Sequence, residues 1–99
     1  MIIITGALRL PASRMEDARP HMRTLIETTR KEAGCLFYAW AEDVLEPGLI
    51  RMIEHWRDWS SFTAHDQSPH AGAWKAALGE IGLLGRDMWA HDGANGRKI

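Results

Sequence analysis

The chain has one cysteine and no excess of either charge. Cys35 has no second cysteine to pair with, and the sequence contains neither a CxxC nor an HExxH spacing, so we expect no internal disulfide and no dedicated metal site. The 12 Lys and Arg face 13 Asp and Glu, for a net charge of -1, and both halves of the chain are balanced. This balance excludes the clustered basic surface of a nucleic-acid-binding protein.

Long apolar runs are also missing. No stretch approaches the roughly 20 apolar residues that span a bilayer, and residues 1–10 lack the basic start and the small-residue cleavage site of a secretory signal. We therefore expect a soluble, cytoplasmic protein with no membrane partner.

Tryptophan, by contrast, is abundant. The 99 residues fit a single domain over 1–99, and a domain of this size buries a smaller fraction of its surface than a large one. Five tryptophans are more than a core of this size is expected to bury, so we expect a partner subunit or a ligand to cover some of them. They are Trp40, Trp56, Trp59, Trp74 and Trp89.

The first third of the chain predicts a strand and then a helix. Residues 1–10 are apolar and end in a Pro-containing turn. Ser13 and Glu16 have the spacing of a capping box, and apolar residues then recur at steps of three and four. We expect a helix over residues 14–33, ended by Gly34 in the left-handed conformation.

The rest of the chain predicts three more strands and two helices. An aromatic-rich segment and an alternating segment form a hairpin, Asp58 caps a short helix, and Ser68 with Pro69 begins a second helix that Gly82 ends. The expected ranges are strands 35–43 and 49–57, helices 58–67 and 68–82, a strand over 83–91 and a loose tail over 93–99.

This order predicts an α+β, ferredoxin-like βαββαβ fold with a four-stranded antiparallel sheet and the helices on one face. In the strand over 49–57, Ile50, Met52, Glu54 and Trp56 share one face. The other face is also partly apolar, and an open face does not tolerate apolar residues over such an area. We therefore expect a homodimer in which two sheets pack face to face to make a β-barrel with the helices outside.

Seven side chains are candidates for a site in a cavity between sheet and helices. Glu54 must be paired or face a wet cavity, because a buried carboxylate is costly. The histidines can instead be exposed or capping groups, and the tryptophans can simply fill the core. By strand alternation, Tyr38 is expected on the same face of its strand as Leu36 and Trp40. The candidates are Tyr38, Glu54, Trp56, Phe62, His65, His70 and Trp74.

Other chemistries have little support. The serines lack a Gly-x-Ser-x-Gly setting, and Cys35 is expected to be a small core residue rather than a nucleophile. His55, His65, His70 and His91 follow no known metal-ligand spacing, so no metal site is expected.

Four stretches of the chain together form a recognisable pattern: Glu32-Ala33-Gly34-Cys35-Leu36-Phe37-Tyr38, Glu54-His55-Trp56-Arg57-Asp58-Trp59, Phe62-Thr63-Ala64-His65 and Ser68-Pro69-His70. They resemble the antibiotic biosynthesis monooxygenase family, including its quinol monooxygenases of the YgiN type. The resemblance covers nearly the whole chain and implies a dimeric α+β barrel. It also implies enzymes that oxygenate hydroquinone-like or anthrone-like aromatics without flavin, haem or metal.

We therefore expect a cofactor-independent monooxygenase that oxidises small quinol-like aromatics with O₂. Such a site needs a base near the substrate hydroxyl and aromatic walls around the ring. His70, at the start of a helix, is expected to be neutral and to act as the base, with Glu54 as a further candidate. His65, near a helix end, is expected to be protonated and to stabilise an anion. The walls are assigned to Tyr38, Trp56, Phe62 and Trp74.

Two alternatives stay open. One is a non-catalytic dimer that binds a small hydrophobic molecule, because a fold does not fix a function. The other is an isomerase that acts on a phosphorylated autoinducer breakdown product, for which Arg51, Arg57 or Lys75 would have to bind the phosphate. The haem-degrading relatives are a poorer match, because Trp74 and Ala7 stand where they carry histidine and asparagine.

Overall fold

The four strands form one antiparallel sheet in the order β2-β3-β1-β4, in a computed structural model that describes residues 1–99. The central strands are β1 (Ile2–Arg9) and β3 (Leu49–Trp56), and the edges are β2 (Cys35–Glu42) and β4 (Gly85–Asp92). Each strand lies within two residues of the range that the sequence predicts.

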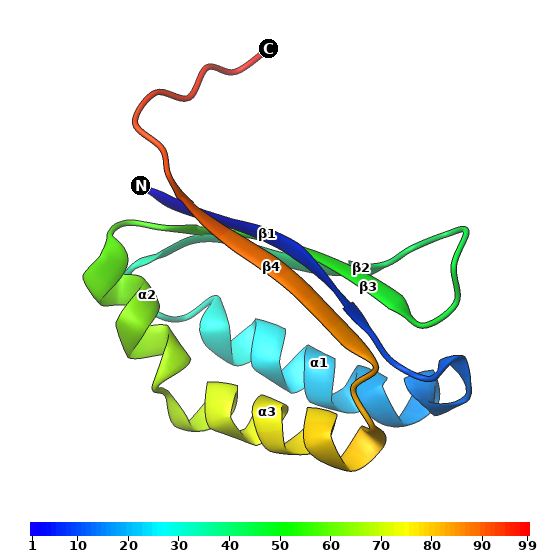
Figure 1. Cartoon of the computed structure of the whole chain (residues 1–99). Coiled ribbons are helices and arrows are strands. Elements are labelled where there is room, and N and C mark those ends of the chain that lie inside the picture. Colours follow the sequence, from blue (N-terminus) through cyan, green and yellow to red (C-terminus); the bar gives the residue numbers. More distant parts are fainter.

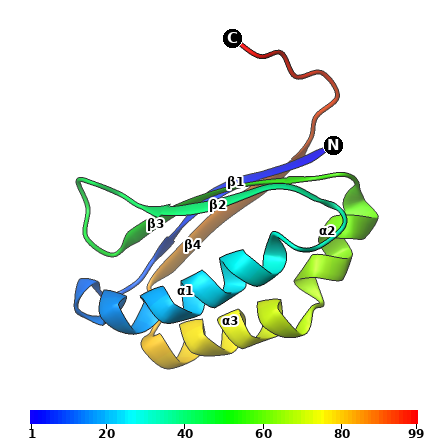
Figure 2. The ribbon, with the colours of Figure 1, turned by 180° about the vertical axis from the view of Figure 1, so that it is seen from behind.

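Three helices lie on one face of this sheet. They are α1 (Met15–Thr29), α2 (Trp59–Asp66) and α3 (Pro69–Ile81). Figure 1 shows α1 and α3 running side by side under the sheet, with α2 at one end, and Figure 2 shows the same layers from behind. The fold is the predicted α+β, ferredoxin-like arrangement.

The predicted caps of α2 and α3 are confirmed. The Asp58 carboxylate accepts a hydrogen bond of 2.8 Å from the Ser61 backbone N–H. Ser68 Oγ accepts from the Ala71 N–H, and Pro69 follows Ser68 at the start of α3. Gly82 ends α3 with a φ of +101°, a conformation that favours glycine.

The predicted start of α1 is within one residue of the observed Met15, but its predicted caps and its predicted end are wrong. Ser13 lies in a 3-10 turn over Ala12–Arg14, and no side chain caps α1. The helix ends at Thr29, four residues early, and Gly34 does not have a positive φ. Gly34 instead permits a close approach, because an added Cβ would lie 2.3 Å from the Ser61 Cβ.

The helix-facing side of the sheet carries the side chains that alternation in β3 predicts. Ile50, Met52, Glu54 and Trp56 are each at most 5% exposed. Cys35 packs against this core, as predicted.

A β-bulge in β2 breaks the predicted alternation there. The register between β2 and β3 shifts between Cys35 and Phe37. Leu36 therefore does not share the face of Tyr38, and its side chain is exposed. Tyr38 and Trp40 keep the helix-facing side, opposite Glu54 and Met52.

No helix covers the other face of the sheet (Figure 1). Phe37, Ile53 and Trp89 are exposed there. Residues 93–99 contain no helix or strand. None of the three helices has the length and apolar character required to cross a membrane.

Candidate functional site

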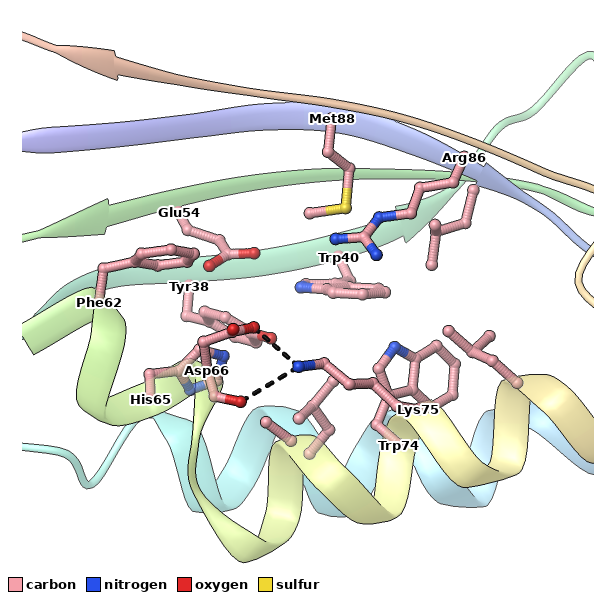
Figure 3. Close-up of a pocket in the computed structure, with 14 residues that line it drawn as sticks. Tyr38, Trp40, Glu54, Phe62, His65, Asp66, Trp74, Lys75, Arg86 and Met88 are labelled. Carbon is pink, nitrogen blue, oxygen red and sulfur yellow. Dashed lines mark hydrogen bonds and ion pairs between the residues drawn. The ribbon is translucent and has the colours of Figure 1, made fainter. Parts of the chain in front are cut away.

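A cavity opens between the helix-facing side of the sheet and helices α2 and α3. Its volume is about 70 Å³. Aromatic side chains from β2, α2 and α3 surround it, and Figure 3 shows them together with the polar groups that interrupt them. We call it the aromatic cavity. It is lined by Leu8, Leu25, Tyr38, Trp40, Glu54, Phe62, His65, Asp66, Ala71, Trp74, Lys75, Leu78, Arg86 and Met88.

Five of the seven candidates from the sequence line this cavity. They are Tyr38, Glu54, Phe62, His65 and Trp74. The other two do not line it. Trp56 is fully buried and donates its indole N–H to Glu54, and His70 contacts Glu32 through its Nε2.

Glu54 lies on β3 with its carboxyl group inside the fold. The residue is 3% exposed, and its one hydrogen-bond partner is the Trp56 indole N–H, which donates to Oε1 at 3.0 Å. No cation neutralises it. Burial therefore raises the pKa of Glu54 to about 7, although the Trp56 hydrogen bond opposes the shift. This carboxyl group can give or take a proton near neutral pH.

Tyr38 lies opposite Glu54 on β2 and is also buried. Burial, and then the neighbouring Glu54 charge, raise the pKa of its phenol. Tyr38 therefore stays protonated at neutral pH. Its ring meets those of Trp56 and His65 edge to face, with the centroids 6.2 and 5.5 Å away.

His65 lies on α2, with its ring packed on Trp56 at a centroid distance of 4.6 Å. Its Nδ1 lies 3.0 Å from Glu32 Oε2. A carboxylate can only accept, so Nδ1 carries the proton and Nε2 of the neutral ring is left as an acceptor.

The predicted charge state of His65 is wrong. Burial lowers the pKa of His65 more than the Glu32 charge raises it, so the imidazole is neutral at pH 7. The helix dipole, from which the sequence predicts the protonated form, is a weaker effect than burial.

Glu32 is a site residue that sequence analysis missed as a functional group. Its Oε1 lies 2.8 Å from His70 Nε2, so one carboxylate contacts both imidazoles. The strand pairing could have indicated that Glu32 lies near His65. Because β2 and β3 are antiparallel neighbours, the turn before β2 meets the helix after β3.

Glu32, His65 and His70 also form the only group of ligand-type side chains close enough to hold a metal ion. Their potential ligand atoms all lie within 4.8 Å of one another. Of the four histidines considered in the sequence, His55 and His91 lie instead on the other face of the sheet, in one row with Ile3.

The cationic groups at the cavity differ from those named in the sequence. Arg51 and Arg57 do not line it, and Lys75 does but is paired with Asp66 at 2.9 Å. Arg86 lines it as well and was missed. The signal was the alternation in β4, which places Arg86 on the same face as Met88.

Solved structures with this fold match the chain over nearly its whole length. A candidate antibiotic biosynthesis monooxygenase of Deinococcus radiodurans superposes with a TM-score of 0.92 and 26% identity, covering 100% of this chain and 98% of that one. A similarly described protein of Caulobacter crescentus gives a TM-score of 0.87 over 95% of this chain and 90% of that one. Its 19% identity supports the shared fold alone.

The chain is also similar to part of a longer curated protein. An uncharacterized protein of Synechocystis is 29% identical over 69 residues, which are 70% of this chain and 47% of that protein. The chain thus spans about half the length of this relative.

The antibiotic biosynthesis monooxygenase family model matches residues 1–77, which run from β1 into α3 and include most of the residues that line the aromatic cavity. The chain therefore belongs to the antibiotic biosynthesis monooxygenase family.

Proposed function

We propose that the protein is a cofactor-independent monooxygenase that oxidises small quinol-like or anthrone-like aromatics with O₂. One observation carries the proposal: Glu54 and the neutral His65 both line an aromatic cavity, and Glu32 fixes the tautomer of His65. Membership of the family supports the general reaction class, and the cavity supports the kind of substrate.

His65 is the base in this proposal. Its Nε2 takes the proton from a substrate hydroxyl or acidic C–H, and the Glu32 carboxylate stabilises the imidazolium that forms. The resulting carbanion or phenolate is electron-rich, so it can pass an electron to O₂ without a metal or a flavin.

The overall reaction balances without another reductant. The substrate radical and the reduced oxygen combine to form a C–O bond. The O–O bond then breaks, and the second oxygen atom leaves as water. The substrate supplies all four electrons. Glu54, with its pKa raised to about 7, supplies a proton to the departing oxygen.

These roles differ from those that the sequence predicted. His70 was expected to be the base, but it does not line the cavity, and its Nε2 contacts Glu32 Oε1 at 2.8 Å. We assign it as a positioning residue that holds Glu32 in place for His65. Trp56 was expected to be a wall residue, and we assign it to holding Glu54 through its indole N–H.

We also propose that the protein is a homodimer. The uncovered face of the sheet carries Phe37, Ile53 and Trp89, each more than a third exposed. A second copy packed through the same face would remove these side chains from water.

Oxygen uptake with menadiol and anthrone tests the activity. We expect enzyme-dependent uptake above the spontaneous rate, and one atom of ¹⁸O₂ in the product. His65→Gln should lower kcat/KM by roughly 10²-fold to 10⁴-fold, as expected for loss of a general base. His21→Gln, an exposed histidine on α1, is the matched control and should keep the native rate. Binding of these aromatics without any oxygen uptake would instead favour the non-catalytic binding dimer.

Glu32→Gln tests whether the Glu32 carboxylate acts on His65. The Glu32 charge raises the pKa of His65, so its removal should move the acid limb of the pH–rate profile to lower pH. Dialysis against EDTA should leave the native rate unchanged. A loss of rate that Fe²⁺ or Zn²⁺ restores would mean that Glu32, His65 and His70 hold a metal, and would contradict the proposal.

A further inference from the structure

The aromatic cavity has a second polar end, away from Glu54 and His65. Arg86 projects into it from β4 (Figure 3). No ion pair of the protein includes Arg86. Lys75, the other cation at the cavity, is paired with Asp66 through its Nζ at 2.9 Å. Arg86 is thus a solvent-exposed cation that lines the cavity and makes no ion pair within the chain.

A buried donor without a well-formed hydrogen bond lies beside this end. Trp40 Nε1 is hidden from solvent and makes no hydrogen bond of standard geometry, although it lies close enough to the Tyr38 hydroxyl to lower the pKa of that phenol. An unpaired buried N–H costs free energy, roughly 1–3 kcal/mol, so it is a place where a ligand acceptor is favoured. Figure 3 shows the Arg86 side chain reaching from β4 toward the part of the cavity where Trp40 and Met88 lie.

The sheet register sets the separation of the two polar ends. On β1, Ile4 lies opposite Glu54 and Leu8 lies opposite Arg86. These two positions are four residues apart, about 13 Å along a strand, and the long Arg86 side chain spans part of that distance. Trp40, with Met52, lies in the row between them. The acid–base end and the Arg86 end are therefore two rows apart on the sheet, with the Trp40 row between them.

We infer that the cavity takes an aromatic carboxylate, with its hydroxyl group toward Glu54 and His65 and its carboxylate between Arg86 and Trp40 Nε1. The carboxylate gives Arg86 a counter-charge and gives the indole N–H an acceptor, and charge-assisted hydrogen bonds are the stronger kind. The orientation of the hydroxyl group rests on the proposed monooxygenase function, whereas the binding of the carboxylate does not depend on that function.

Binding of unreactive probes tests the carboxylate end by itself. Benzoate, its neutral isostere benzamide, and phenyl phosphate are titrated into the native protein, with calorimetry and tryptophan fluorescence as readouts. We expect benzoate to bind at least about tenfold tighter than benzamide, the size expected for one charge-assisted contact. Arg86→Gln should bring the two affinities within about twofold, and Trp40→Phe should reduce the preference severalfold.

Arg9→Gln is the matched control. Arg9 lies at the same end of the sheet and makes a surface ion pair with Glu46, but it does not line the cavity. It should keep the native preference. Equal affinities for benzoate and benzamide in the native protein, no binding of any probe, or an unchanged preference in Arg86→Gln would each overturn the inference. Phenyl phosphate binding more than about tenfold tighter than benzoate would also overturn it, in favour of a phosphate ester.

Turnover separates this inference from the proposed function. We expect 2,5-dihydroxybenzoate to be oxidised with a higher kcat/KM than hydroquinone, and Arg86→Gln to remove the difference. If neither compound is oxidised but benzoate binding depends on Arg86, the carboxylate end stands and the monooxygenase function is wrong. If both are oxidised equally and benzoate binds no better than benzamide, the monooxygenase function stands and the carboxylate end is wrong.

Discussion

Glu54 is a buried carboxyl group whose only hydrogen-bond partner is an indole rather than a cation. Its protonated form is therefore favoured in the folded chain, while in the unfolded chain it ionises at its usual pKa of 4.5. The folded state binds this proton more tightly between about pH 4.5 and pH 7. Stability from Glu54 is fully present below that window and is lost as the pH rises through it.

Glu54→Gln removes this titration and keeps an oxygen that can accept from Trp56. We expect the variant to gain stability relative to the native protein as the pH rises from about 5 to 8, by up to roughly 3 kcal/mol for a shift of this size. Urea unfolding at a series of pH values measures the difference. Glu27→Gln, at an exposed carboxylate of α1, is the matched control. A stability difference for Glu54→Gln that does not change with pH would show that Glu54 ionises normally.

Which site residues could be predicted depended on how local their signal is. Glu54 was recognised because strand alternation in β3 places a carboxylate among apolar side chains, and the next few residues carry the whole pattern. Glu32 contacts His65 from 33 residues away, so only the packing of the turn before β2 against α2 reveals it. His70 looked like a base because its place at a helix start is visible in the sequence, whereas its distance from the cavity is not.

At the scale of elements, the same distinction separates the correct boundaries from the wrong ones. Asp58, Ser68 and Gly82 act within a few residues of themselves, and the sequence predicted all three ends correctly. Gly34 has the spacing of a helix-ending glycine, but its backbone conformation is ordinary and its small size serves a contact with α2. A glycine required by a distant neighbour cannot be distinguished in one sequence from a glycine required by a turn.

This contact makes a prediction about the turn between α1 and β2. Gly34→Ala would place a Cβ 2.2 Å from Ser61 Oγ and 2.3 Å from its Cβ, so the turn or α2 must move. We expect a loss of roughly 1–3 kcal/mol, typical of overpacking. Because Glu32 is on this turn and His65 on α2, activity should fall as well. Urea unfolding and oxygen uptake measure the two effects.

Gly79 is the control for this substitution. It lies inside α3, and nothing lies within 4 Å of an added Cβ, so Gly79→Ala should stabilise the protein by about 0.5–1 kcal/mol. The double variant with Gly34→Ala and Ser61→Gly removes both close atoms and should recover much of the loss. Native stability of Gly34→Ala would mean that α2 does not pack against this turn.

At the scale of the whole molecule, the sequence predicted the four-stranded antiparallel sheet and the placing of the helices on one of its faces. Both follow from the order of elements and the alternation of apolar residues. It also showed that each face of the sheet carries apolar side chains. One chain covers only one of these faces, and Trp89 remains 63% exposed on the other. A cover for the second face would have to come from another molecule. Neither the apolar pattern of the sequence nor the structure of one chain therefore identifies it.

A second copy is the expected cover, and one charge placed on the open face tests it. Light scattering at micromolar concentration should give about twice 11.2 kDa for the native protein. Ile53 lies in the middle of this face, opposite Thr5 and Ala39 on the neighbouring strands. Ile53→Asp would bury two charges at a twofold interface with no partner for either, so it should halve the measured mass. Val44→Asp adds the same charge in the turn between β2 and β3, where the side chain is 96% exposed, and should leave the mass unchanged. A stable native monomer, or an Ile53→Asp variant of native mass, would mean that the sheet face is not the interface.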